Sequence, residues 1–179
     1  MNKILRNTDI EILMLLLTIY NPIIVNQPQA IAETLSFSTS SIRNTTTGNN
    51  MTQTFHGSYE MLINESRLLT QSYQKEIGKW ESKEYDNKTM ISVTENYLPK
   101  FQKLVNRAEA LQPITAKDSQ AQDLYIKSLH SEMESYKHFR YFLATGNPAE
   151  DDKSTQLLSD ALRYEANSFA AFNNATNNG

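Results

Sequence analysis

Cysteine is absent from this 179-residue chain, and glycine and proline occur only five times each. Without cysteine there are no disulfides, thiolate nucleophiles, thiolate zinc sites or iron–sulfur clusters. The few glycines form no phosphate-binding loop, because neither GxxxxGK[ST] nor GxGxxG is present. Scarce glycine and proline also favour helices over an all-β fold, since hairpins need many turn residues.

Neither sign of charge is in large surplus, since 17 basic residues accompany 20 acidic ones and the net charge is −3. A nucleic-acid-binding domain usually has a basic face and a high pI. Because the pI here is about 5.6, we expect no nucleic-acid partner. The chain also lacks a G-x-S-x-G elbow and a Glu-x-x-His motif, which argues against a hydrolase triad and a ferritin-like metal site. We therefore expect no enzymatic activity and no cofactor.

An apolar run lies close to the N-terminus, over residues 12–19, and it follows Lys3 and Arg6. An Ala-Ile-Ala sequence stands at residues 30–32. This order predicts a secretory signal peptide over residues 1–32. The alternative is an uncleaved membrane anchor, because no charged residue falls between residues 12 and 32. In either case we expect a secreted or extracytoplasmic protein that contacts a membrane only through an uncleaved N-terminal segment.

Residues 33–54 are rich in Ser, Thr and Asn and poor in large apolar side chains. Such a segment gains too little from burial to offset its ordering entropy, so the composition predicts a flexible linker. Glycosylation sequons occur in this segment at Asn44 and Asn50. An exposed, exported linker is a suitable setting for their use, and unused sequons are the alternative.

From residue 55 onward, apolar side chains recur at helical spacing in four stretches. They predict helices near residues 53–84, 88–112 and 115–146, with a fourth that begins at Pro148. Long helices joined by loops of about two to five residues pack against their neighbours in alternating directions. The sequence therefore predicts an all-α, antiparallel up-down-up-down four-helix bundle over residues 55–175, followed by a disordered tail over residues 176–179.

The third stretch organises the chain, because its apolar seam needs other helices on which to pack. Thr115 and Asp118 predict a capping box at its start, and Gly146 predicts a left-handed end. Asn147 and Pro148 then have the chemistry of a helix cap and a first helical residue. The seam consists of Ile126, Leu129, Met133, Tyr136 and Leu143.

The neighbouring stretches have irregularities of their own. Asp86 is the expected cap of the second helix. Pro99 falls within that helix, where it predicts a kink or a restart near residues 95–98. Ser66 interrupts the apolar series of the first helix. The expected apolar face of the last helix is Leu158, Leu162, Phe169 and Phe172, with alanines between them for close packing.

Several of these features occur together: LQP at residues 111–113, the aromatic third helix, GNP at residues 146–148 and an Ala-rich last helix. In this pattern the chain resembles small exported helical-bundle proteins of bacteria and archaea. The resemblance covers about residues 55–175 and implies the fold and an extracytoplasmic location. Most such proteins have no assigned function, so the resemblance implies no site residues.

Two groups on the third helix are candidate sites. His130, Glu134 and His138 share one face at four-residue steps, where they could hold zinc or copper; a solvated charged face is the alternative. Tyr125, Phe139 and Tyr141 exceed what a leucine-based seam requires. They predict either core packing or an exposed aromatic strip for a partner or ligand.

The sequence therefore predicts a non-catalytic, extracytoplasmic binding protein that contacts a protein partner or an envelope component. The alternative is a carrier or sensor of a small ligand or a metal ion. That protein would use an aromatic cleft between helices or the His130–Glu134–His138 face. The sequence does not predict an oligomeric state.

Overall fold

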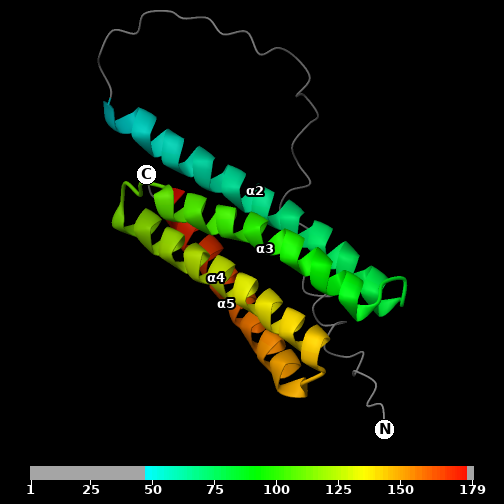
Figure 1. Ribbon diagram of the computed structural model, residues 1–179. Coiled ribbons are helices and arrows are strands. Elements are labelled where there is room, and N and C mark those ends of the chain that lie inside the picture. Colours follow the sequence, from blue (N-terminus) through cyan, green and yellow to red (C-terminus); the bar gives the residue numbers. More distant parts are fainter. Residues whose placement is uncertain (1–46, 177–179) are drawn as a thin grey trace, which may run out of the picture. The chain divides into compact units, whose positions relative to one another are not determined.

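A computed structural model of the chain describes the backbone of residues 47–176 and the side chains of residues 55–175. Within that range the protein is all-α, and four helices pack against one another with no strand (Figure 1). They are α2 (Thr47–Glu81), α3 (Asn87–Ala110), α4 (Ala116–Thr145) and α5 (Pro148–Thr176). The predicted all-α, four-helix architecture is confirmed there. The predicted signal or anchor segment at residues 1–32, linker residues 33–46 and tail residues 177–179 lie outside the described residues.

The predicted caps of α3 and α4 are confirmed. The carboxylate of Asp86 accepts a hydrogen bond from the backbone N–H of Thr89 at 2.7 Å, which caps α3. A reciprocal capping box between Thr115 and Asp118 starts α4. Gly146 ends α4 with a left-handed φ of 68°, a conformation that glycine adopts without a Cβ penalty.

Two helix boundaries and the predicted restart of α3 differ from expectation. Helix α2 begins at Thr47 rather than near residue 53, so part of the predicted linker is helical. It ends at Glu81, and Lys83 in the following turn has a φ of 65°. The predicted restart in α3 is wrong, because the helix continues through Pro99. Pro99 and Glu95 are both exposed, so water can satisfy the Glu95 carbonyl that loses its helical donor.

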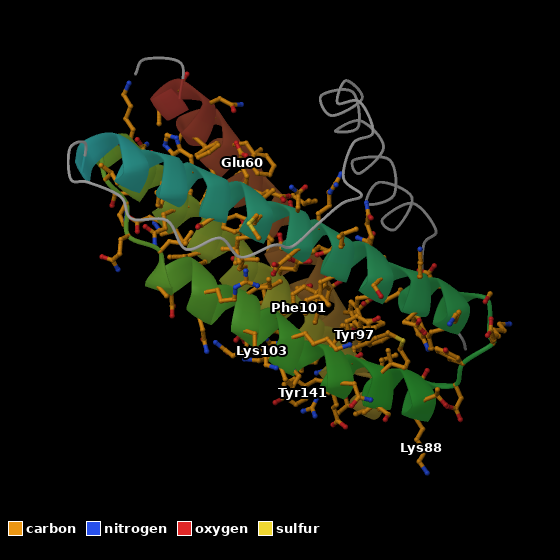
Figure 2. All side chains as sticks on the ribbon, turned by 90° about the horizontal axis from the view of Figure 1, so that it is seen from above. Glu60, Lys88, Tyr97, Phe101, Lys103 and Tyr141 are labelled. Carbon is orange, nitrogen blue, oxygen red and sulfur yellow. The ribbon has the colours of Figure 1, made fainter. Side chains whose placement is uncertain are left out.

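Helix α4 packs against both α3 and α5, and α2 packs against α3. Four of the five predicted seam residues of α4 are buried, and Ile126 is half-buried against them. Aromatic side chains dominate the contact between α2, α3 and α4. The ring centroid of Tyr73 lies 4.4 Å from that of Tyr136 and 5.0 Å from that of Tyr97. Figure 2 shows Tyr97 and Phe101 between the ribbons of α2 and α3.

Helix α5 packs differently, through small residues. Of its predicted apolar face only Phe172 is fully buried, whereas Leu158, Leu162 and Phe169 are half-buried. The side chains that face α4 are instead Ser154, Ala161 and Ser168. The predicted apolar face of α5 is therefore rotated about the helix axis from the face that contacts α4. The small side chains let the backbones of α4 and α5 approach closely, and Figure 1 shows the two helices side by side.

Three serine hydroxyls bridge the two helices, and we call these bonds the hydroxyl ladder. Ser128 donates to the Ala161 carbonyl at 2.9 Å, and Ser135 donates to the Ser154 carbonyl at 2.8 Å. Ser168 on α5 donates in the other direction, to the carbonyl of Ala121 at 2.9 Å. On each helix the residues concerned are seven apart, so they return to the same face after two turns.

Candidate functional site

A carboxylate lies inside the bundle on α4. Glu132 is only 9% exposed, because it stands three residues after Leu129 and four before Tyr136, within the buried seam. Its Oε1 atom accepts hydrogen bonds from the hydroxyls of Thr70 at 2.6 Å and Tyr136 at 2.7 Å. Burial raises the pKa of Glu132, and the two hydrogen bonds counteract only part of that effect.

A second carboxylate approaches from α5. Glu165 lies between Ala161 and Ser168 of the small-residue face and is partly buried. Burial, and to a smaller extent the charge of Glu132, raise the pKa of Glu165 to about 7. Among the described side chains, no Lys or Arg forms an ion pair with either group. We call Glu132 and Glu165 the carboxylate pair.

Two buried tyrosines, Tyr59 and Tyr125, interact electrostatically with the carboxylate pair. Tyr125 shares a hydrogen bond with Ser66, so the gap in the apolar series of α2 is filled by a polar partner. Tyr59 bonds Ser168 and donates to the carbonyl of Ala121 at 3.1 Å. Burial raises the pKa of Tyr59 to about 12 and that of Tyr125 higher still. These phenols therefore stay neutral and add no negative charge beside the carboxylates.

The carboxylate pair gives this interior a group that can gain or lose a proton. A carboxylic acid whose pKa lies near 7 exchanges its proton within the ordinary pH range of biological fluids. Because Glu132 and Glu165 interact, their protons leave in two steps that belong to the pair. The surrounding hydroxyls donate hydrogen bonds and hold the negative form of Glu132 in place.

A second contact that involves a buried carboxylate lies at the start of α4. Nε2 of His56 is 2.9 Å from Oδ1 of Asp118, and the Asp118 carboxylate is fully buried. Burial alone would raise the pKa of Asp118, but hydrogen bonds from His56 and Thr115 outweigh it and lower the pKa. The capping box of α4 is thus joined to α2 by a long-range contact.

The three residues of the predicted metal face do not converge. His130 is exposed and its Nε2 lies 3.3 Å from Glu109 on α3. His138 instead contacts Glu150 on α5, with 2.6 Å between Nδ1 and Oε2. Glu134 pairs with Lys137 at 2.6 Å. Within residues 55–175, no group of three or more His, Cys, Asp or Glu side chains is arranged to hold a metal ion.

The predicted aromatic strip is likewise divided. Tyr125 is 1% exposed and Phe139 is 9% exposed, the latter with its ring edge against Trp80 at a centroid distance of 5.3 Å. Tyr141 is 47% exposed, and the guanidinium of Arg140 lies 4.9 Å from its ring centroid. Two of the three residues are core, and one is on the surface.

Of the two linker sequons, Asn44 lies outside the described residues, and Asn50 lies in the first turns of α2.

Sequence reasoning missed Glu132, Glu165 and His56. The available signal was position: both glutamates fall at seam spacing on their helices, and a charged residue at such a position needs either a partner or a raised pKa. His56 gave no such signal, because its partner Asp118 is 62 residues away in the chain.

One open groove lies on the surface formed by α4 and α5. It has a volume of about 460 Å³, and both polar and apolar side chains line it. Its lining residues are Lys117, Gln120, Leu124, Asn167, Ala170, Ala171 and Asn174. None of the residues predicted as a site lies in this groove.

Comparison with known proteins adds no relative: no family model, no curated protein and no solved structure matches the chain. Among the helices of the described part, none has the length and apolar character needed to span a membrane.

Proposed function

We propose that this protein acts outside the cytoplasm by non-catalytic binding to a protein partner or an envelope component. The observation that carries the proposal is the outer face of α2, where Met61 is 62% exposed and Leu68 is 60% exposed. Seven residues separate them, so both side chains project from the same face of the helix. Large apolar side chains that share an exposed face provide the kind of surface on which a partner docks.

The extracytoplasmic part of the proposal rests on the N-terminal sequence. Residues 1–32 combine basic residues, a short apolar run and an Ala-Ile-Ala sequence, which is typical of a signal peptide or, if uncleaved, a membrane anchor. N-terminal sequencing of the protein recovered from its source cell tests this. A mature chain that begins near residue 33 supports export with cleavage, and a chain that begins at Met1 in the cytosolic fraction contradicts export.

We further propose that the four helices alternate in direction, as an up-down-up-down bundle. Two sets of contacts support this arrangement. Ser128 and Ser135 of α4 bond Ala161 and Ser154 of α5, so the numbering rises on one helix while it falls on the other. On α2 and α4 the numbering rises together, from His56–Asp118 to Thr70–Glu132, as expected for helices two places apart in such a bundle.

Photo-crosslinking tests the binding surface on α2. A photoreactive phenylalanine analogue replaces Leu68 in the full-length protein, and the matched control replaces Lys103, an exposed residue of α3 (Figure 2). In the source cell we expect a discrete cross-linked partner from position 68 and none from position 103. Equal labelling from both positions would mean that α2 presents no specific surface.

The second candidate is a small-ligand carrier, and the groove between α4 and α5 favours it. Lys117 and the amides of Gln120 and Asn167 suit a polar ligand with an anionic group. A thermal-shift screen of small carboxylates tests this candidate, because a ligand that binds the native state raises its melting temperature. A Lys117→Met variant should lose any such shift.

A further inference from the structure

We propose that protonation of the carboxylate pair controls how firmly α5 packs against α4 and α2, so that the bundle loosens when both carboxylates are ionised. The inference concerns the interior of the protein and is independent of what the protein binds. It makes the attachment of α5 sensitive to pH within the range that surroundings outside the cytoplasm commonly span.

The first basis is the weak apolar attachment of α5. Small side chains and the hydroxyl ladder hold this helix to α4. Its large apolar residues contribute little, since only Phe172 joins the core cluster as a fully buried side chain. Burial of apolar area is the main stabilising term in most helix contacts. A helix attached through serine and alanine therefore has less stabilisation with which to resist charge repulsion.

The second basis is the placement of Glu165 within that contact. It lies four residues after Ala161 and three before Ser168, both of which are buried against α4. The side chain of Glu165 therefore faces into the contact between helices. No hydrogen bond from a described residue holds its carboxylate, in contrast to Glu132, which accepts bonds from Thr70 and Tyr136.

The third basis is the absence of a compensating charge among the described residues that act on the pair. From α2, Tyr59 faces Glu165; from α4, Glu132 and Tyr125 face it. The neighbours of Glu132 are Tyr136 and Tyr125 on its own helix and Thr70 on α2. All of these neighbours are neutral or acidic. Two ionised carboxylates would repel each other across the α4–α5 contact without a cation to offset them.

The direction of the effect follows from the titration of Glu165. Its pKa in the packed bundle is about 7, above the ordinary value of 4.5, so the packed state binds the proton more tightly than an opened state. The resulting stabilisation is complete below about pH 4.5 and is lost as the pH rises through about 7. Alkaline conditions should therefore loosen α5.

Amide hydrogen exchange of the purified protein measures this loosening. After correction for the intrinsic rate, protection of α5 amides should fall by about tenfold to 25-fold between about pH 5.5 and pH 8.0, as the shifted pKa requires. Amides in the N-terminal half of α3 are the internal reference, because that segment does not contact the carboxylate pair. Equal protection of α5 at both pH values would overturn the inference.

A Glu165→Gln variant separates the pair from every other titrating group. Glutamine keeps the shape of the side chain but cannot ionise, so the variant should show nearly the same α5 protection at both pH values. The matched control is Glu60→Gln, at an exposed position on α2 (Figure 2), and it should keep the wild-type dependence. If α5 protection in Glu165→Gln changes with pH as much as in the wild-type protein, the carboxylate pair does not control the packing of α5.

Carbon-13 NMR of the glutamate side-chain carboxyls provides a test that needs no variant. In the wild-type protein one carboxyl should titrate within about one unit of pH 7. If every glutamate carboxyl titrates below about pH 5.5, the pair stores no proton near neutrality and the inference fails.

Discussion

Hydroxyl groups occupy many of the interior positions at which a helical bundle usually places aliphatic side chains. Ser66, Thr94, Ser128, Ser135 and Ser168 are all buried. Each has a hydrogen-bond partner on its own helix or on a neighbouring one. A buried hydroxyl is costly without a partner and roughly neutral with one. These contacts therefore select one arrangement of the side chains more than they add to the free energy of unfolding.

The contact between Tyr125 and Ser66 gives a prediction for a single residue. A Tyr125→Phe substitution keeps the ring in the core and removes its hydroxyl, which also donates to the Leu62 carbonyl. Ser66 keeps a bond to the carbonyl of Ile63 at 2.9 Å. The cost should therefore be close to that of one ordinary buried hydrogen bond, about 1 kcal/mol in the free energy of unfolding.

Urea denaturation followed by circular dichroism measures this cost. Tyr141→Phe is the matched control, because Tyr141 is exposed. The control should change the free energy of unfolding by less than about 0.5 kcal/mol. If the two variants have equal stability, the Tyr125 hydroxyl is not part of a buried network.

The sequence predicted those residue features that depend on near neighbours. The Thr115–Asp118 capping box and the left-handed Gly146 are set within a few residues, and both predictions were correct. It also identified Ser66 as an interruption but could not supply its partner, which lies 59 residues away. Partners of buried polar groups depend on how the helices pack, and a helical pattern does not specify that.

At the scale of helices, the contact between α4 and α5 is the most distinctive feature. Apolar spacing placed Leu158, Leu162 and Phe169 on the buried face of α5, yet these three are only half-buried. The contact with α4 is instead made by Ala161, which was expected to allow close packing, and by Ser154 and Ser168, which were not predicted. The error has a physical cause: a hydrophobicity pattern counts large side chains, whereas close helix packing favours small ones. For the same reason the pattern did not reveal Glu165, which lies beside these small residues.

An Ala161→Leu substitution tests this close approach. The buried Ala161 is 4% exposed, and Ser128 donates to its carbonyl. A leucine there would push α5 away from α4 and weaken the hydroxyl ladder. Overpacking of this kind costs about 1–3 kcal/mol in the free energy of unfolding.

Chemical denaturation of the variant measures that loss, and Ala170→Leu is the control because Ala170 is exposed on the same helix. The control should stay within about 0.5 kcal/mol of wild type. Leucine at position 161 without loss of stability would mean that the two helices are not closely packed there.

For the molecule as a whole, two groups of carboxylates respond oppositely to pH. Hydrogen bonds from His56 and Thr115 outweigh the burial of Asp118 and lower its pKa, so the stability it supplies is present above its ordinary value of 3.8. That stability is lost as the pH falls through the lowered pKa. Burial raises the pKa values of Glu132 and Glu165, so their contribution is lost as the pH rises instead.

These opposite signs predict a stability maximum at mildly acidic pH. The melting temperature should fall as the pH drops below about 4, toward the lowered pKa of Asp118, and it should also fall as the pH rises from about 4.5 to about 7, between the ordinary and the raised pKa of Glu165. Thermal unfolding followed by circular dichroism at a series of pH values gives the profile. Asp118→Asn should flatten its acid side and Glu165→Gln its alkaline side. A melting temperature that rises steadily up to pH 8 in the wild-type protein would contradict the raised pKa of Glu165, because stability can increase with pH only where the unfolded chain binds more protons than the folded one.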